Sequence, residues 1–152
     1  MLNQPLATGL SNYLAGADDL STLVRGTDID GLSIMTAGPQ PPSTPELLAG
    51  DRLSILLERL GETFDHVVLD LPPVMGLADA PLIASKIEGT LMVTAAHSTH
   101  KNVARLAVGR LRSAHAHLLG VVLSMFDSRQ ASYGYGYGYG YGEGYSYGDQ
   151  AK

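Results

Sequence analysis

The chain has 152 residues, of which 45% are apolar and 16% are charged, and it contains no cysteine. This length and composition predict a single domain that can fill a hydrophobic core. No apolar run reaches the roughly 18 residues of a membrane-spanning helix, and the first residues lack the pattern of a signal peptide. Because disulfides and thiolate metal sites are excluded, we expect a cytoplasmic protein.

The net charge of −5 is unevenly distributed along the chain. Residues 1–80 carry eleven acidic and three basic side chains, whereas residues 81–152 carry four acidic and seven basic ones. Such asymmetry is compatible with a docking surface. It is too weak to indicate a nucleic-acid partner, and we predict none.

The first predicted elements are two short helices with Ser11 and Asp18 as their N-caps. Gly16 is expected to end the first of them. A short strand is predicted over residues 32–36. The glycine- and proline-containing residues 37–43 form a loop after it.

Two further helices are predicted before the middle of the chain. Thr44 and Pro45 read as an N-cap followed by proline at the first helical position. The next helix ends at Gly61. Its apolar face consists of Leu53, Leu56, Leu57 and Leu60.

The continuous apolar run Val67–Leu69 predicts a strand buried on both faces of a parallel sheet. Pro72 and Pro73 lack the N–H groups that a ladder needs, so the strand must end before them. Asp70 is therefore placed at the carboxyl end of a central strand, where open α/β sheets bind ligands. A carboxylate there suits Mg²⁺ beside phosphates. An aspartate that caps an ordinary turn explains the spacing equally well.

Alternating helices and strands complete the predicted fold. Asp79 heads a helix over residues 80–86, strands follow at 90–94 and 120–125, and Thr99 caps the helix between them. The side chains of that helix expected to face inward are Val103, Leu106, Leu111 and Ala114. Strands alternating with helices require right-handed crossovers, which predicts an α/β fold with a three-layer parallel sheet and about four visible strands.

Seven of the eight tyrosines lie near the C-terminus, alternating mainly with glycine. They are Tyr133, Tyr135, Tyr137, Tyr139, Tyr141, Tyr145 and Tyr147. Glycine at every second position weakens a strand, and the segment contains no aliphatic residue. We therefore predict a folded domain over residues 1–130 and a disordered tail over residues 131–152.

Histidines and cations surround the helix that begins near Thr99. The histidines are His97, His100, His115 and His117, and neither pair has the i, i+4 spacing of a helical zinc site, so we predict no metal there. The cations Lys101, Arg105 and Arg112 fall on the predicted outer face. That face is either solvated or a docking surface for an acidic partner, such as a neighbouring phosphorylated tail.

Taken in order, five segments resemble the cytoplasmic catalytic domain of bacterial tyrosine autokinases. Residues 9–16 match the segment that follows the second phosphate-site motif of this family, and residues 37–48 match its proline-rich loop and helix. Residues 67–80 carry its aspartate, double-proline and Asp-Ala pattern, and residues 120–127 its last strand. The tyrosine cluster at 133–147 is the most distinctive shared feature. These kinases are deviant P-loop ATPases that drive capsule and exopolysaccharide synthesis.

The resemblance implies ATP and Mg²⁺ as cofactors. It implies that Asp70 is the catalytic, Walker B-like acid and holds Mg²⁺ through water, with Ser124 and Asp127 at the nucleotide-binding edge. The seven tail tyrosines would be phosphoacceptors. It further implies a homo-oligomer, a membrane-bound activator or chain-length regulator, a cognate phosphatase, and a location at the inner face of the plasma membrane.

Three departures from the family pattern qualify these expectations. No stretch fits G-x-x-x-x-G-K-[ST], the phosphate-binding loop, which the family places before the position of Met1. We therefore expect an N-terminally incomplete domain that does not bind ATP alone. Leu71 and Ser124 stand where the family usually has a hydroxyl residue and often an asparagine, which affects only details.

Two other functions remain open from the sequence. The chain could be a non-catalytic interaction or phosphoacceptor module built on a P-loop-like remnant. It could also be a cell-division or plasmid-partition ATPase of the same superfamily, although that class gives no reason for a tyrosine-rich tail.

Overall fold

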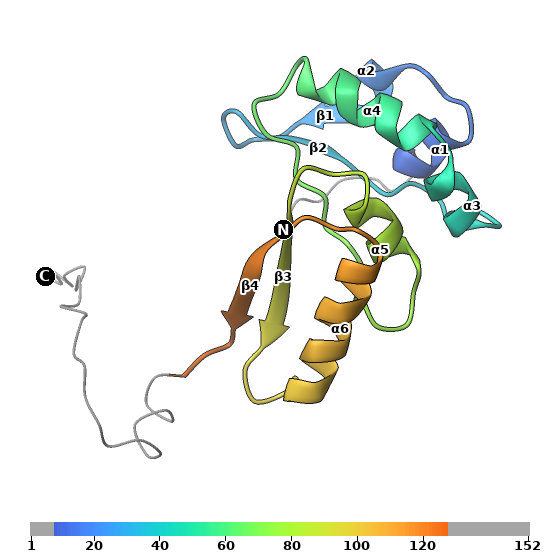
Figure 1. Ribbon diagram of the computed structural model, residues 1–152. Coiled ribbons are helices and arrows are strands. Elements are labelled where there is room, and N and C mark those ends of the chain that lie inside the picture. The colour runs from blue at the N-terminus through green and yellow to red at the C-terminus, as the bar shows by residue number, and fades with distance from the viewer. Residues whose placement is uncertain (1–7, 128–152) are drawn as a thin grey trace, which may run out of the picture.

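The computed structural model describes residues 8–127. The first part of the chain forms α1 (Leu10–Leu14), α2 (Leu20–Leu23), β1 (Val24–Gly26), β2 (Ser33–Met35), α3 (Thr44–Ala49) and α4 (Arg52–Gly61). The second part forms α5 (Asp79–Ala84), β3 (Thr90–Ala95), α6 (Lys101–Ser113) and β4 (Leu118–Ser124). In Figure 1 the first part lies above, the β3–α6–β4 unit lies below, and α5 lies between them.

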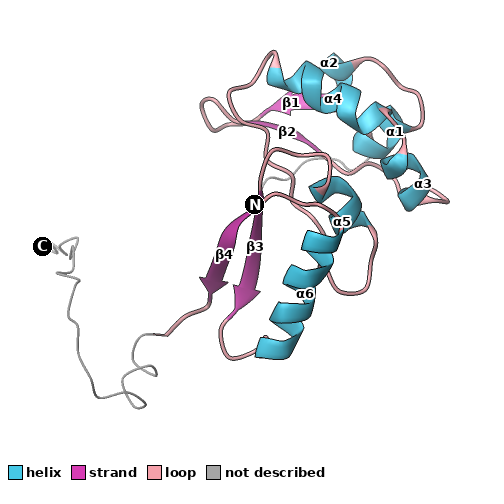
Figure 2. Cartoon of the chain, in the orientation of Figure 1, coloured by secondary structure: helices cyan, strands magenta, loops and turns pink. Residues whose placement is uncertain are grey.

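The strands form two separate pairs. β1 and β2 pair antiparallel as a hairpin, with Arg25 opposite Ile34, and β3 and β4 pair parallel, with Val93 opposite Val122. Figure 2 shows α6 alongside the β3–β4 pair as its crossover helix. The predicted α/β class with parallel strands is confirmed, but a single sheet of four strands is not observed among residues 8–127. The prediction missed β1, and β2 pairs with it in the antiparallel sense.

The prediction of a central strand at Val67–Leu69 is wrong for the described part of the chain. Residues 65–73 form no strand, and Val68 is 89% exposed. Exposure alternates along the segment: Leu69 and Leu71 pack against an apolar cluster, whereas Asp70 is exposed. One side of this segment is therefore packed and the other is bare. A strand also requires a hydrogen-bonded neighbour, and neither described sheet supplies one for these residues.

The larger of two apolar clusters, called the first core, joins α1–α5. Its buried members are Tyr13, Leu14, Leu23, Leu48, Leu53, Leu56 and Ile83. Leu57 and Leu60 pack against it, so the predicted apolar face of α4 is confirmed. Arg52 stabilises the exposed side of this cluster. Its guanidinium stacks over the Tyr13 ring at 4.7 Å and donates a hydrogen bond to the Tyr13 carbonyl at 2.7 Å. It also pairs with Asp18 at 2.6 Å.

The smaller cluster, called the second core, lies between α5, α6 and the β3–β4 pair. Its buried members are Ala84, Met92, Ala107 and Leu111. The packed stripe of α6 is Ala104, Ala107, Val108 and Leu111, which follows the i, i+3, i+4, i+7 spacing of one helix face. The prediction was right for Leu111 but wrong for Val103 and Leu106, which are 42% and 62% exposed. Ala104 and Ala107 face the second core instead, and Val103 and Leu106 point to solvent.

Several predicted helix caps are displaced. The N-cap of α1 is Gly9 rather than Ser11, because the N–H groups of Leu10 and Ser11 donate to the carbonyls of Thr36 and Ala37 at 2.8 and 2.9 Å. α3 is capped at Ser43 rather than Thr44, and the cap of α6 is His100 rather than Thr99.

Two aspartates near helix starts also differ from prediction. Asp19, rather than Asp18, caps α2 by accepting from the Ser21 N–H at 3.0 Å. Asp79 lies at the first position of α5 and makes no cap hydrogen bond. Its charge there complements the helix dipole. Among residues 8–127, no helix is long and apolar enough to cross a membrane.

Candidate functional site

Asp70 lies between Leu69 and Leu71, whose side chains pack against the first core. The carboxylate itself is exposed and forms no hydrogen bond or ion pair with another residue in the described part of the chain. The two neighbouring leucines hold the backbone, so Asp70 projects from an anchored segment. A carboxylate presented in this way is available as an oxygen ligand.

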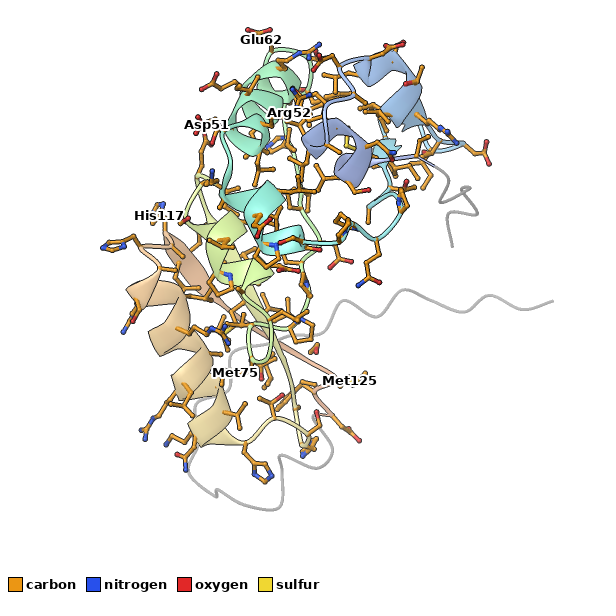
Figure 3. All side chains as sticks on the ribbon, turned by 90° about the vertical axis from the view of Figure 1, so that its right-hand side faces the viewer. Asp51, Arg52, Glu62, Met75, His117 and Met125 are labelled. Atoms are coloured by element: carbon orange, nitrogen blue, oxygen red, sulfur yellow. The ribbon has the colours of Figure 1, made fainter. Side chains whose placement is uncertain are left out.

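Ser124 lies at the carboxyl end of β4, where both parallel strands end. Its hydroxyl donates to the Thr94 carbonyl at 3.3 Å, and its own carbonyl accepts from the Ala96 N–H at 2.8 Å. Asp127 follows three residues later and is exposed. In Figure 3, Met75, which follows the Asp70 segment, and Met125, which follows β4, both lie toward the lower end, opposite His117. The Asp70 and β4 segments therefore lead toward the same end of the molecule.

Two of the family-like segments are brought into contact. The N-terminus of α1, within residues 9–16, donates two hydrogen bonds into the 36–37 backbone. Gly9 must be glycine, because a Cβ there would collide with the Thr36 carbonyl. Gly38 has φ +77°, and a Cβ on it would lie 2.5 Å from the Ser11 hydroxyl oxygen. The two segments that resemble the family, far apart in the sequence, therefore pack against each other in the fold.

Asp70 fits one part of a Mg-nucleotide site. A single carboxylate can hold Mg²⁺ through water when phosphates complete the coordination shell. No group of three or more His, Cys, Asp or Glu side chains able to hold a metal occurs within residues 8–127. A hollow of about 540 Å³ lies elsewhere, between the β1–β2 turn and residues 63–66, and it does not include Asp70.

A second groove lies between α6 and β4 and has a volume of about 350 Å³. It is lined by Met92, Lys101, Ala104, Arg105, Val108, Gly109, Arg112 and Val121. Sequence analysis placed the three cations on the outer face of α6 but missed the apolar floor beside them. That floor depends on the pairing of β4 with β3, which the helical pattern alone does not reveal. The predicted acceptors Tyr133–Tyr147 lie outside the described residues.

Comparison with known proteins identifies the relationship. No family model matches the chain. Tyrosine-protein kinase CpsD of Streptococcus agalactiae is 30% identical over 83% of this chain and 55% of its own length. The solved kinase domain of Escherichia coli tyrosine kinase ETK superposes with a TM-score of 0.78 at 33% identity, covering 90% of this chain and 53% of that one. The chimerical protein CapA2B2 gives a TM-score of 0.75 at 29% identity, covering 80% and 54%.

These similarities extend over most of this chain but only part of each relative. The chain spans about half the length of the CpsD relative and of the two solved structures. Sequence and three-dimensional structure agree on the same group of proteins. The chain is a homologue of the bacterial tyrosine-protein kinases, and its fold is that of part of their kinase domain.

Proposed function

We propose that this chain is the C-terminal part of an ATP-dependent protein-tyrosine autokinase of capsule or exopolysaccharide synthesis. The observation that carries the proposal is the joint occurrence of kinase homology and a cluster of seven tyrosines at one end of the chain. The relatives named CpsD support a role in capsule synthesis. An ordinary P-loop ATPase would account for the homologous fold but not for the tyrosines.

In this proposal Asp70 is the acid that holds Mg²⁺ through water, and the nucleotide lies where the β3–β4 pair ends, near Ser124 and Asp127. Bound Mg-ATP would supply the phosphoryl group that ends on a tyrosine hydroxyl. The anchored backbone on either side of Asp70 supports its role, because phosphoryl transfer depends on positioning and charge neutralisation more than on covalent chemistry. The tail tyrosines act as acceptors and contribute no catalytic group.

The three-layer P-loop sheet and the phosphate-binding loop belong to the complete domain in this proposal. The residues present contain no G-x-x-x-x-G-K-[ST] sequence. We therefore propose that a segment outside these 152 residues completes both the sheet and the ATP site. The exposed side of the Asp70 segment and the uncovered β3–β4 face support this view, because parallel sheets normally bury both faces of their apolar strands.

We also propose that the complete kinase forms homo-oligomers and acts with a membrane-bound activator and a cognate phosphatase at the inner face of the plasma membrane. The chimerical protein CapA2B2 supports the idea of a kinase joined to a second protein. A non-catalytic phosphoacceptor module is the second candidate, favoured by the absence of a phosphate-binding loop from these 152 residues.

A chimera tests the proposal. Residues 8–152 would replace the matching part of the ETK kinase domain, which supplies the missing loop. We expect phosphate on the tail tyrosines by phosphopeptide mass spectrometry. Replacing all seven with Phe should remove most of the label while Mg-ATP binding persists, and replacing any one should remove only part of it.

Two controls separate the candidates. The Asp70→Asn chimera should lose labelling yet keep its unfolding midpoint, whereas Tyr13→Phe should keep its label, since Tyr13 is buried. Phosphate found mainly on Tyr13 or on serines would contradict the acceptor assignment. Undiminished labelling in Asp70→Asn would favour the non-catalytic module.

A further inference from the structure

The groove between α6 and β4 combines an apolar floor with a line of positive charge. Met92 is buried at its base, and Val121, which lies opposite Met92 in the strand register, forms its β4 side. Ala104 and Val108 form the helix side. Val121 is nevertheless 51% exposed, because α6 leaves this part of the edge strand uncovered. The floor is thus apolar and open to a ligand.

Three cations border this floor. Lys101, Arg105 and Arg112 are spaced by four and seven residues, so they lie along one stripe of α6. All three are exposed and line the groove. No acidic side chain lines it, and none of the three cations has an ion pair or hydrogen bond within the described residues. Their positive charge is therefore available to an anionic ligand.

An apolar floor bordered by unpaired cations suits an aromatic ring that carries a phosphate. Guanidinium groups hold phosphate oxygens through two parallel hydrogen bonds, and phosphotyrosine carries about 1.5 to 2 negative charges at neutral pH. The floor provides contact for the ring. A phosphoserine would satisfy the cations but leave the floor unused.

We propose that this groove binds phosphotyrosine from the Tyr/Gly segment, residues 133–147. The inference rests on the proposed function, which makes these tyrosines phosphoacceptors. Unphosphorylated, the segment offers the cations little negative charge, since Glu143 is its only acidic residue. Each phosphate added would increase its charge complementarity to the groove.

The chain length permits this contact. β4 ends at Ser124, at the edge of the sheet where the chain leaves β3 for α6. The nine residues from Ser124 to Tyr133 can span up to about 30 Å. The 13 residues of α6 extend about 20 Å. The chain between Ser124 and Tyr133 is therefore long enough for the first tail tyrosines to reach the groove of their own chain.

Fluorescence anisotropy with labelled synthetic peptides tests the inference on the full 152-residue chain. The probe is the 131–147 sequence carrying phosphotyrosine at one tail position, compared with its unphosphorylated and phosphoserine counterparts. We expect the phosphotyrosine peptide to bind at least about tenfold more tightly than the unphosphorylated one. Arg105→Gln and Arg112→Gln should each weaken binding by about five- to tenfold.

Arg110→Gln is the matched control, because it removes the same charge from the same helix outside the groove. It should leave the affinity unchanged. Equal binding of the phosphoserine peptide, or equal loss in the three variants, would overturn the inference. So would binding of anionic lipid vesicles that depends on Arg105 and Arg112 without any phosphotyrosine binding. Because the peptide is synthesised with its phosphate, the result does not depend on kinase activity. A negative result would therefore overturn this inference without contradicting the proposed function.

Discussion

The two cores of the molecule differ in how completely they are covered. The first core buries large side chains on all sides: Tyr13, Leu53 and Leu56 are at most 2% exposed. The second core is built mainly of alanines around Met92 and Leu111. On the far side of its sheet, Leu91 and Val93 are 61% and 65% exposed.

This difference suggests that the first core determines the stability of the fold, whereas the exposed β3–β4 face determines association with other chains or segments. Burial of apolar area contributes about 25 cal/mol for each Å² removed from water, so the first core, with more and larger buried side chains, contributes more to stability than the second. The β3–β4 pair leaves apolar surface and an open strand edge, which are features of an interface with another chain or segment. We expect substitutions in the first core to change unfolding, and those on the sheet face to change association.

The largest effect is expected from Leu53→Ala. Leu53 is 0% exposed, so the substitution leaves a cavity and should lower the free energy of unfolding by about 2–5 kcal/mol. Urea unfolding followed by circular dichroism measures it. Leu106→Ala on α6 is the control, because Leu106 is 62% exposed and its loss should cost under about 0.5 kcal/mol. If Leu53→Ala and Leu106→Ala lowered the free energy of unfolding equally, the first core would not be the main source of stability.

An intermediate effect is expected from Arg52→Ala. The substitution removes the hydrogen bond to the Tyr13 carbonyl, the stacking over the Tyr13 ring and the ion pair with Asp18. The side chain is partly exposed, so we expect a loss of about 1–2 kcal/mol in unfolding free energy. Asp18→Asn removes only the ion pair and should cost less than about 1 kcal/mol. If Asp18→Asn cost as much as Arg52→Ala, the ion pair alone would explain the effect.

The smallest effect on unfolding is expected from Leu91→Thr combined with Val93→Thr. Both residues lie on the bare face of β3, so the free energy of unfolding should change by no more than about 0.5 kcal/mol. Association should nevertheless decrease, because threonine keeps the strand but removes apolar contact. Sedimentation velocity measures the fraction of dimers and larger species. Val103→Thr with Leu106→Thr is the control on α6, and a wild-type chain that is monomeric throughout would refute the expectation.

Sequence reasoning located the elements whose pattern is local. β3 lies within one residue of its predicted bounds, α4 ends at the predicted Gly61, and α6 begins two residues after its predicted cap Thr99. Helical periodicity and short apolar runs are properties of the segment itself, so they can be read from the sequence. The N-caps of α1 and α2 were displaced by one or two residues. In α1 the reason is visible: its first N–H groups are satisfied by the distant 36–37 backbone rather than by a local side chain.

The errors concern features that depend on distant partners. The Val67–Leu69 run has the composition of a buried strand, but a strand exists only where a neighbour completes the ladder. The inward face of α6 was assigned to large residues such as Leu106, whereas close packing against the sheet selected Ala107. For the candidate site, Asp70 stays a prediction made from its flanking sequence, and the floor of the α6–β4 groove required the strand register.

The two cores are joined by short connections, and this has a thermodynamic consequence. Leu69 and Leu71 belong to the first core and Val74 to the second, while the adjacent residues Ile83 and Ala84 of α5 are divided in the same way. Because these neighbouring residues pack in different cores, a large shift of one core would pull side chains out of the other core. An ion held at Asp70 would fix the backbone that both cores share, and so favour the packed arrangement of each. By reciprocity, the integrity of either core would raise the affinity for that ion by the same factor.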